Sequence, residues 1–359
     1  MADMLDYLEL RGDVSFDDEP FNEVDNLVLA ELSYTVFDGI VGEGPEEVPL
    51  EEADEAFFAA HPRSEVRQES NHILRAPLLM DAMLSGRRFR GCRLTRYVDV
   101  INAGKDMQMA AVTVLLEDGS AYVSFRGTDD SVAGWKEDFN MSYLPDTAGQ
   151  QSALRYLDRI AEETDRPLRV GGHSKGGNFA VYASAFCDEK VQDRIMAVYT
   201  NDGPGFRKEV MSREGFPRIM PKVVSIVPDT SVVGMLLASG AEHMIVKSSG
   251  MGIAQHDPLT WQIDESRFVT AEQSALGHFI HGSQKDWLSR IDDKSREMFV
   301  NTLFSVIGAT GVDTFGEMAE NKLKSAERML AEIRGMSAAR RKEFLSIVAE
   351  LLHAAGRRL

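Results

Sequence analysis

The sequence has few of the features on which secreted, disulfide-rich or membrane-spanning proteins depend. Only two cysteines, Cys92 and Cys187, occur among 359 residues, so at most one disulfide can form, and an extracellular disulfide framework is excluded. Residues 1–9 are acidic and lack a basic segment followed by an apolar one, so we expect no signal peptide. No run approaches the roughly 20 apolar residues of a membrane-spanning helix, since the longest, 232–238, is far shorter.

Positive charge is also scarce. The chain has 39 Lys and Arg against 57 Asp and Glu, which gives a net charge of −18. Such an acidic surface repels polyanions, so nucleic acid is not expected as a partner. The short basic runs at 87–90 and 340–342 read as solvated helix ends. These features together predict a cytoplasmic protein without a transmembrane segment.

Hydrophobic periodicity predicts an α/β fold. Several segments have the alternating or continuous apolar pattern of strands, and others have apolar residues at helical spacing. The expected strands are 92–102, 107–116, 121–125, 168–170, 195–200 and 223–227, and the expected helices are 21–37, 71–85, 151–164 and 178–186. Residues 117–120 are a hairpin turn signal, and the Glu-, Pro- and Gly-rich residues 41–66 read as a surface excursion. Hairpins followed by alternating strands and helices predict a mixed sheet covered by helices on both faces.

The pattern changes near residue 286, after which no strand-like run occurs. Three helices are expected, at 295–307, 313–333 and 338–354. We therefore predict a main domain over residues 1–285, with an N-terminal helical lead-in, and a helical extension over 286–359. The extension would either cover the core of the main domain or provide a surface for homo-oligomers.

The strongest functional motif is Gly172-x-Ser174-x-Gly176, which stands between a strand-like run and a helix of small and apolar residues. This pattern is typical of a nucleophile elbow, in which a serine occupies a strained turn and glycines avoid collisions with neighbouring elements. A bystander serine in a glycine-rich turn is the alternative interpretation. The motif predicts Ser174 as a nucleophile and the backbone N–H of Lys175 as an oxyanion donor.

A second motif lies upstream, where a strand runs into Phe125-Arg126-Gly127-Thr128 and a Trp-x-x-Asp segment follows at 135–138. With these motifs the chain resembles the class 3 lipases of the α/β-hydrolase fold, and residues 200–206 resemble the strand end that follows their nucleophile helix. Over about residues 1–290 it is similar to the bacterial family of unknown function called Mbeg-like, itself lipase-like, in the segments 5–13, 21–27, 32–34 and 255–261.

The resemblance implies an α/β-hydrolase fold and places Thr128 in the oxyanion hole, through its backbone N–H and its hydroxyl. We interpret Arg126 and Asp138 as an ion pair that braces the same loop. Residues 129–147 form a candidate cap, with Trp135, Phe139, Met141, Tyr143 and Leu144 as apolar lining, and 232–237 form a candidate opposite wall. Core packing is the alternative for both segments.

The catalytic base should follow the nucleophile and the acid in the chain. His256 lies in a glycine-rich loop after the last expected strand, where this fold places its histidine, and we predict it as the base. His281 and His243 are the alternatives. His278 and His281 could share a helical face, but a metal site there would need a third ligand that the sequence does not indicate. His173, next to the nucleophile, should point away from it.

Two carboxylates compete for the role of the acid. Asp229 directly follows the strand 223–227, at the sheet edge where the family has its acid, and we predict it. The family's aspartate usually precedes a Val-Pro pair, whereas here Val227-Pro228 precedes Asp229. The alignment of Asp229 with the family's acid is therefore undecided from the sequence. Asp202 is the alternative, although its Gly-Pro context suits an Asx turn.

The sequence thus predicts a serine hydrolase that cleaves a small or lipid-like carboxylic ester through an acyl-enzyme, with no metal and no cofactor. A hydrolase-fold binding or regulatory protein without turnover, or an acyltransferase with the same triad, are the alternatives.

Overall fold

A single mixed sheet organises the computed structural model, which describes residues 2–69 and 72–356. Its eight strands lie side by side in chain order, and they are β1 (Val48–Pro49), β2 (Arg93–Asn102), β3 (Met107–Leu115), β4 (Ala121–Phe125), β5 (Leu168–His173), β6 (Ile195–Asn201), β7 (Val223–Pro228) and β8 (His243–Val246). The pairings from β1 to β4 are antiparallel, and those from β4 to β8 are parallel. The predicted fold class, a mixed α/β sheet flanked by helices, is confirmed.

The β3–β4 hairpin forms at the predicted turn. Gly119 has φ of 84°, a conformation that favours glycine, and the Ser120 N–H and hydroxyl both donate to the Asp118 carboxylate. All residues of β3, β4 and β5 are buried, because helices cover both faces of the sheet.

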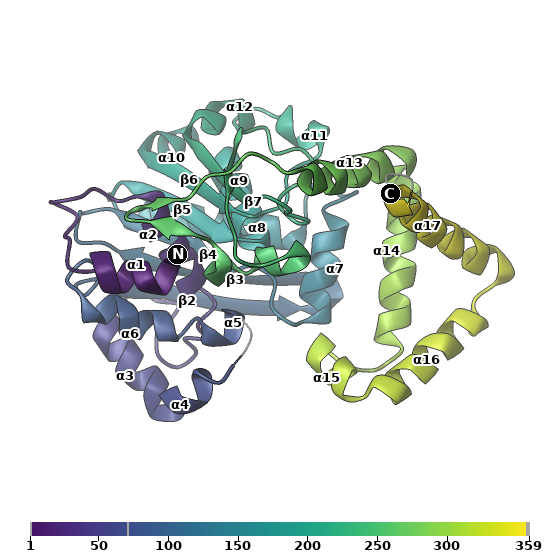
Figure 1. Cartoon of the computed structure of the whole chain (residues 1–359), viewed down its shortest axis with the longest axis horizontal. Helices are drawn as coiled ribbons and strands as arrows, with labels where there is room; N and C mark the ends of the chain where they lie inside the picture. Colours follow the sequence, from purple (N-terminus) through teal and green to yellow (C-terminus); the bar gives the residue numbers. More distant parts are fainter. Residues whose placement is uncertain (1, 70–71, 357–359) are drawn as a thin grey trace.

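Each face of the sheet has its own hydrophobic core. Val112 and Val114 of β3 face a core built with α1 (Met4–Arg11) and α2 (Glu23–Leu32). Ala111 and Leu115 of the same strand face a second core built with α8 (Ala148–Glu163) and α9 (Lys175–Phe186). This division follows from the period of two along a strand, and Figure 1 shows the two helical layers.

The segment 41–66, expected as a surface excursion, instead contains α3 (Leu50–Ala60) and α4 (Arg63–Val66). Leu50, Ala53 and Phe57 lie at helical spacing and are buried in the first core, a pattern that the surrounding Glu and Pro residues obscure. The helix expected at 71–85 is two helices, α5 (His72–Arg75) and α6 (Leu78–Ser85), separated at Pro77; residue 71 lies outside the described residues.

Shorter elements complete the sheet domain. They are α7 (Val132–Asn140), α10 (Glu189–Arg194), α11 (Lys208–Met211), α12 (Phe216–Ile219), the short 3₁₀ helices η1 (Ala103–Lys105), η2 (Met220–Lys222), η3 (Gly252–His256) and η4 (Pro258–Thr260), and a hairpin of β9 (Ile263–Asp264) and β10 (Arg267–Phe268).

The C-terminal part is helical, as predicted. It comprises α13 (Ala275–Arg290), α14 (Asp293–Gly308), α15 (Phe315–Glu320), α16 (Lys322–Gly335) and α17 (Ala338–Gly356), which extend to one side of the sheet. The helix expected at 313–333 is divided at Asn321, and α13 crosses the predicted boundary at residue 285. Phe139 of α7 packs against Phe304 of α14, with ring centroids 5.7 Å apart. Among the described residues, no helix is long and apolar enough to cross a bilayer.

Candidate active site

Ser174 occupies a strained turn between β5 and α9. Its φ of 56° and ψ of −130° lie in a region that residues with a side chain rarely adopt. The flanking glycines make room for the end of β4: a Cβ at Gly172 or Gly176 would lie 2.4 or 2.0 Å from the Phe125 carbonyl oxygen. The motif therefore forms the sharp strand-to-helix turn that the sequence predicted.

The His256 ring bridges Ser174 and Asp202. Its Nε2 lies 3.0 Å from the Ser174 Oγ, and its Nδ1 lies 2.6 Å from the Asp202 Oδ2. Asp202 is fully buried, whereas the imidazole is 25% exposed, so the ring is open to solvent on one side while its orienting carboxylate is not. A carboxylate can only accept a hydrogen bond, so Asp202 fixes the proton on Nδ1 and leaves the lone pair of Nε2 directed at the serine.

This geometry corrects the predicted acid. Asp229 does not hold the ring of His256; its Oδ1 accepts a hydrogen bond from the Ser274 N–H, at the start of α13. Asp202 occupies the position instead, and its Oδ1 is held by the Gly234 N–H at 3.1 Å and by the Ser231 hydroxyl.

The register of the sheet explains why Asp202, and not Asp229, lies beside His256. In the parallel pair of β5 and β6, His173 is opposite Asn201, so Ser174 and Asp202 follow their strands at the same level. Asp229 follows β7, one strand farther from the elbow. Asp202 has φ of 49°, and its side chain makes no Asx turn but points to the histidine.

Among the described residues, neither alternative histidine is hydrogen-bonded to Ser174 or Asp202, whereas His256 is bonded to both. His243 begins β8, and its Nδ1 lies 2.9 Å from the Ser225 hydroxyl; burial lowers its pKa, and nearby His281 lowers it further. His281 and His278 lie in α13. His173, as expected, turns away from Ser174: its Nε2 lies 3.0 Å from the backbone oxygen of His256.

The Phe-Arg-Gly-Thr loop lies against the elbow. A Cβ at Gly127 would be 3.1 Å from the Ser174 Cβ and 2.6 Å from the His173 carbonyl oxygen, so only glycine permits this approach. The hydroxyl of Thr128 donates to the Asp138 Oδ2 at 2.5 Å. Because this proton is already bound by Asp138, the Thr128 hydroxyl does not donate to an oxyanion hole, although the sequence had led us to expect that it would. The hydroxyl instead holds the loop against α7. Burial raises the pKa of Asp138 to about 6.

The predicted ion pair between Arg126 and Asp138 is wrong. The two terminal nitrogens of Arg126 instead bind the two carboxylate oxygens of Asp99 at 2.8 Å, and one of them lies 3.3 Å from Asp129. Arg126 thus fastens the loop to β2, in a bidentate pair that suits the planar guanidinium.

The side chain of Lys175 forms a buried ion pair that sequence reasoning missed. Its Nζ donates to the Gln108 Oε1 at 2.6 Å and lies 3.4 Å from the Glu137 Oε2, and both charged side chains are fully buried. Glu137 also accepts from the backbone N–H of Gln108 and of Gly149. The residue after the candidate nucleophile is thereby tied to β3, α7 and α8. Lys175 and Glu137 lie 38 residues apart in the chain, so no local pattern in the sequence indicated that they pair.

The candidate cap is mostly core. Tyr143, Phe139 and Leu144 pack with the C-terminal helices, and Met141 lies in the second core, while Trp135 is 42% exposed. On the opposite wall, Val232 is exposed and Met235 is buried. Two further apolar side chains, Met251 and Ile253, are well exposed in the segment that leads to His256.

Comparison with known proteins shows the family to which the chain belongs. The Mbeg1-like family model matches residues 83–305, a range that includes Ser174, Asp202, His256 and both glycine motifs. The chain belongs to the Mbeg1-like family. Among solved structures it is similar to the M37 lipase, with 12% identity and a TM-score of 0.35 over 58% of this chain and 67% of that chain. No match was found among the curated proteins.

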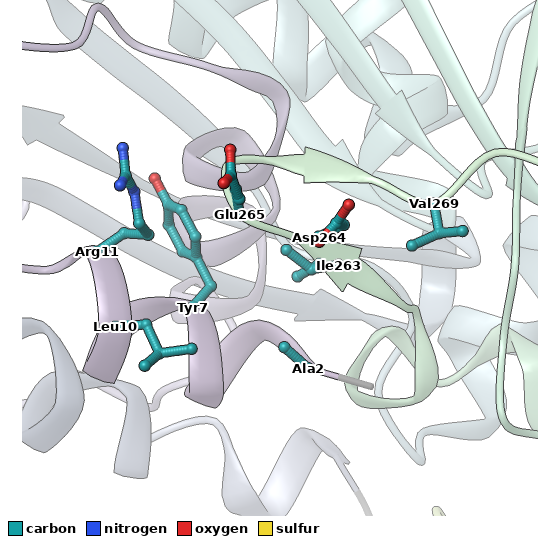
Figure 2. Close-up of a pocket in the computed structure, with 8 residues that line it drawn as sticks. All are labelled: Ala2, Tyr7, Leu10, Arg11, Ile263, Asp264, Glu265 and Val269. Carbon is teal, nitrogen blue, oxygen red and sulfur yellow. The ribbon is translucent and has the colours of Figure 1, made fainter.

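A cavity of about 600 Å³ lies apart from the triad, between α1 and the β9–β10 hairpin. Figure 2 shows its lining residues, among them Tyr7, Arg11 and Glu265. Two of these polar groups are already engaged, since the Tyr7 hydroxyl donates to Asp25 and Arg11 pairs with Glu19. This cavity is therefore no part of the candidate active site.

Proposed function

We propose that this protein is a serine hydrolase that cleaves carboxylic esters through an acyl-enzyme on Ser174. The observation that carries the proposal is the chain of contacts from Asp202 through His256 to Ser174, at 2.6 and 3.0 Å. A neutral imidazole that is held by a buried carboxylate can take the proton of a serine hydroxyl as its oxygen attacks a carbonyl.

The reaction proceeds in two halves. Ser174 Oγ bonds to the acyl carbon while His256 Nε2 takes its proton, and the tetrahedral intermediate collapses when His256 returns that proton to the leaving alkoxide. Water then attacks the acyl-enzyme with the same histidine as base, and the acid is released. Asp202 stabilises the imidazolium that forms in each half.

The proposed oxyanion hole consists of two backbone N–H groups, those of Thr128 and Lys175. Support comes from the way both residues are fixed: the Thr128 hydroxyl is bound to Asp138, and the Lys175 ammonium is bound in its buried pair. Donors held in place before the reaction stabilise developing charge without reorganisation, and one such donor typically contributes about 3 kcal/mol.

The proposed substrate is a small or lipid-like ester with an apolar acyl group. The exposed apolar side chains of Trp135, Met251 and Ile253 support this choice, because they lie close in the chain to residues of the candidate site. Trp135 follows Gly134, which packs against the Thr128 methyl. Met251 and Ile253 precede His256. Apolar groups beside a reactive centre favour apolar ligand parts.

The proposal is tested with a fluorophosphonate probe and intact-protein mass spectrometry. We expect one adduct on the folded protein and none on Ser174→Ala. His256→Ala should also lose labelling, whereas His281→Ala, a matched histidine change outside the triad, should label normally. A folded wild type that forms no adduct would favour the binding-protein alternative, and product analysis with an added alcohol separates hydrolysis from acyl transfer.

A further inference from the structure

A buried carboxylate lies beside the ring of His173, the residue that precedes Ser174. Glu31 of α2 is 1% exposed, and in the described part of the chain its ion pairs are with imidazoles only. Its Oε2 is 2.9 Å from His72 Nδ1, and its Oε1 is 3.4 Å from His173 Nδ1. The three side chains come from α2, α5 and β5, and one ligand atom of each lies within 4.8 Å of the others.

The tautomer of His173 makes this arrangement incomplete. Its Nε2 faces the backbone oxygen of His256 at 3.0 Å, and because a carbonyl only accepts, Nε2 carries the proton. Nδ1 then accepts a hydrogen bond from the Tyr34 hydroxyl at 3.0 Å and lies 3.4 Å from the Glu31 Oε1. Two acceptors thus face each other, and Glu31 Oε1 is buried without a hydrogen-bond donor among the described residues. Such a group is costly unless a cation or a donor satisfies it.

We propose that Glu31, His72 and His173 bind a zinc ion. Two imidazoles and a carboxylate form a ligand set that zinc accepts, and imidazole disfavours magnesium and calcium. Zinc on His173 Nδ1 would replace the hydrogen bond that this nitrogen accepts from the Tyr34 hydroxyl. A cavity of about 10 Å³, about the space of one water molecule, borders Glu31 and His72 on the side away from His173, which does not line it.

The surroundings fit this role. A metal-binding histidine commonly donates its other N–H to a backbone carbonyl, which fixes the ring, and His173 Nε2 does so toward His256. His72 is 13% exposed and offers a path of entry from the surface. The zinc would not touch Ser174; it would join α2 and α5 to the end of β5 and, through His173, hold the backbone of His256 in position.

The test measures zinc in the purified full chain, so its readout does not depend on turnover. After dialysis against micromolar zinc and then against metal-free buffer, mass spectrometry of the metal should find one zinc per chain. Cobalt(II) added to the zinc-free protein should give visible d–d absorption, and zinc should raise Tm. In His72→Ala, whose side chain is the most exposed of the three, retained zinc should fall at least about tenfold, because a lost ligand costs no less than a lost outer-sphere partner.

Glu31→Gln should lose zinc to the same extent as His72→Ala. If Glu31→Gln does not fold, His72→Ala decides the outcome. His281→Ala is the control, because His281 belongs to the other histidine pair considered for a metal, His278 and His281 of α13; it should retain full zinc. A wild type without zinc, a His72→Ala protein that keeps it, or a His281→Ala protein that loses it would each overturn the proposal.

Discussion

Asp202 and Ser174 follow neighbouring parallel strands at the same level, because Asn201 and His173 are opposite one another in the register of β6 and β5. The shared level lets one imidazole reach both side chains. The carboxylate that binds His256 is therefore the one that follows β6, the strand next to the β5 strand that leads into the Ser174 turn.

Replacement of the two rival aspartates should separate their roles. Asp202→Asn keeps the shape of the side chain but can favour the wrong tautomer of His256, so we expect kcat on a short p-nitrophenyl ester to fall by about 10⁴. Asp229→Asn, which affects only the start of α13, should leave kcat near that of the wild type. Equal loss in both variants, with Tm unchanged, would contradict the assignment of Asp202.

The raised pKa of Asp138 predicts a pH-dependent stability. A carboxyl group whose pKa is about 6 in the folded state, against 3.8 ordinarily, binds its proton more tightly when folded, so its contribution to the free energy of unfolding falls as pH rises from about 4 to about 6. Asp138→Asn removes this loss. We expect the variant to match the wild type near pH 4 and to be more stable by about 1–3 kcal/mol near pH 7.5, measured by urea unfolding.

The exposed carboxylate of Asp17 provides the control for this measurement. Asp17→Asn should leave the difference in stability between the two pH values as it is in the wild type. If Asp138→Asn is equally destabilised at both pH values, the anchoring of Thr128 outweighs the buried charge.

The ion pair of Lys175 and Glu137 should contribute strongly to stability. Glu137→Gln removes the carboxylate that contacts the buried ammonium and leaves only the more distant charge of Asp138, and we expect a loss of about 3–5 kcal/mol in the free energy of unfolding. The added change Lys175→Met should restore part of that loss, since it removes the unpaired charge. As a control, Glu189→Gln removes an exposed partner of Arg218 and should change the free energy of unfolding very little, because solvent screens exposed ion pairs. A Glu137→Gln protein as stable as this control would show that the pair is weak.

The elbow should not tolerate a methyl group. In Gly176→Ala the new Cβ would lie 2.0 Å from the Phe125 carbonyl oxygen, and backbone must move, so both Tm and fluorophosphonate labelling should fall. Gly308→Ala, in open space at the end of α14, should keep or slightly raise Tm, because alanine is favoured over glycine in a helix by about 1 kcal/mol. Normal labelling of a folded Gly176→Ala protein would disprove the steric argument.

Local pattern predicted most of the sheet and the turn that carries Ser174. Periodicity and turn residues identified six of the strands, because those signals are local. The strand β8 was missed since His243 and its four-residue length give little apolar pattern, and α3 was hidden by acidic residues on its exposed face.

The site was predicted only as far as its local motifs extend. Ser174 and His256 lie in recognisable turns and loops, and the structure brings them together. Whether Asp202 or Asp229 binds His256 depends on the order of the strands in the sheet, and the residues that flank each aspartate in the sequence do not show that order. The Glu31, His72 and His173 cluster comes from three segments that lie far apart in the chain, so no sequence motif indicates it.

The strict chain order of the strands has a consequence for synthesis. Each strand from β2 to β8 pairs with the strand made just before it, so the sheet can grow by addition at one edge while the chain emerges from the ribosome. Ser174 and Asp202 are then in place well before residue 256 is made. A nascent chain in this state has the strained turn that carries Ser174 but lacks the imidazole that the proposed mechanism needs as its base.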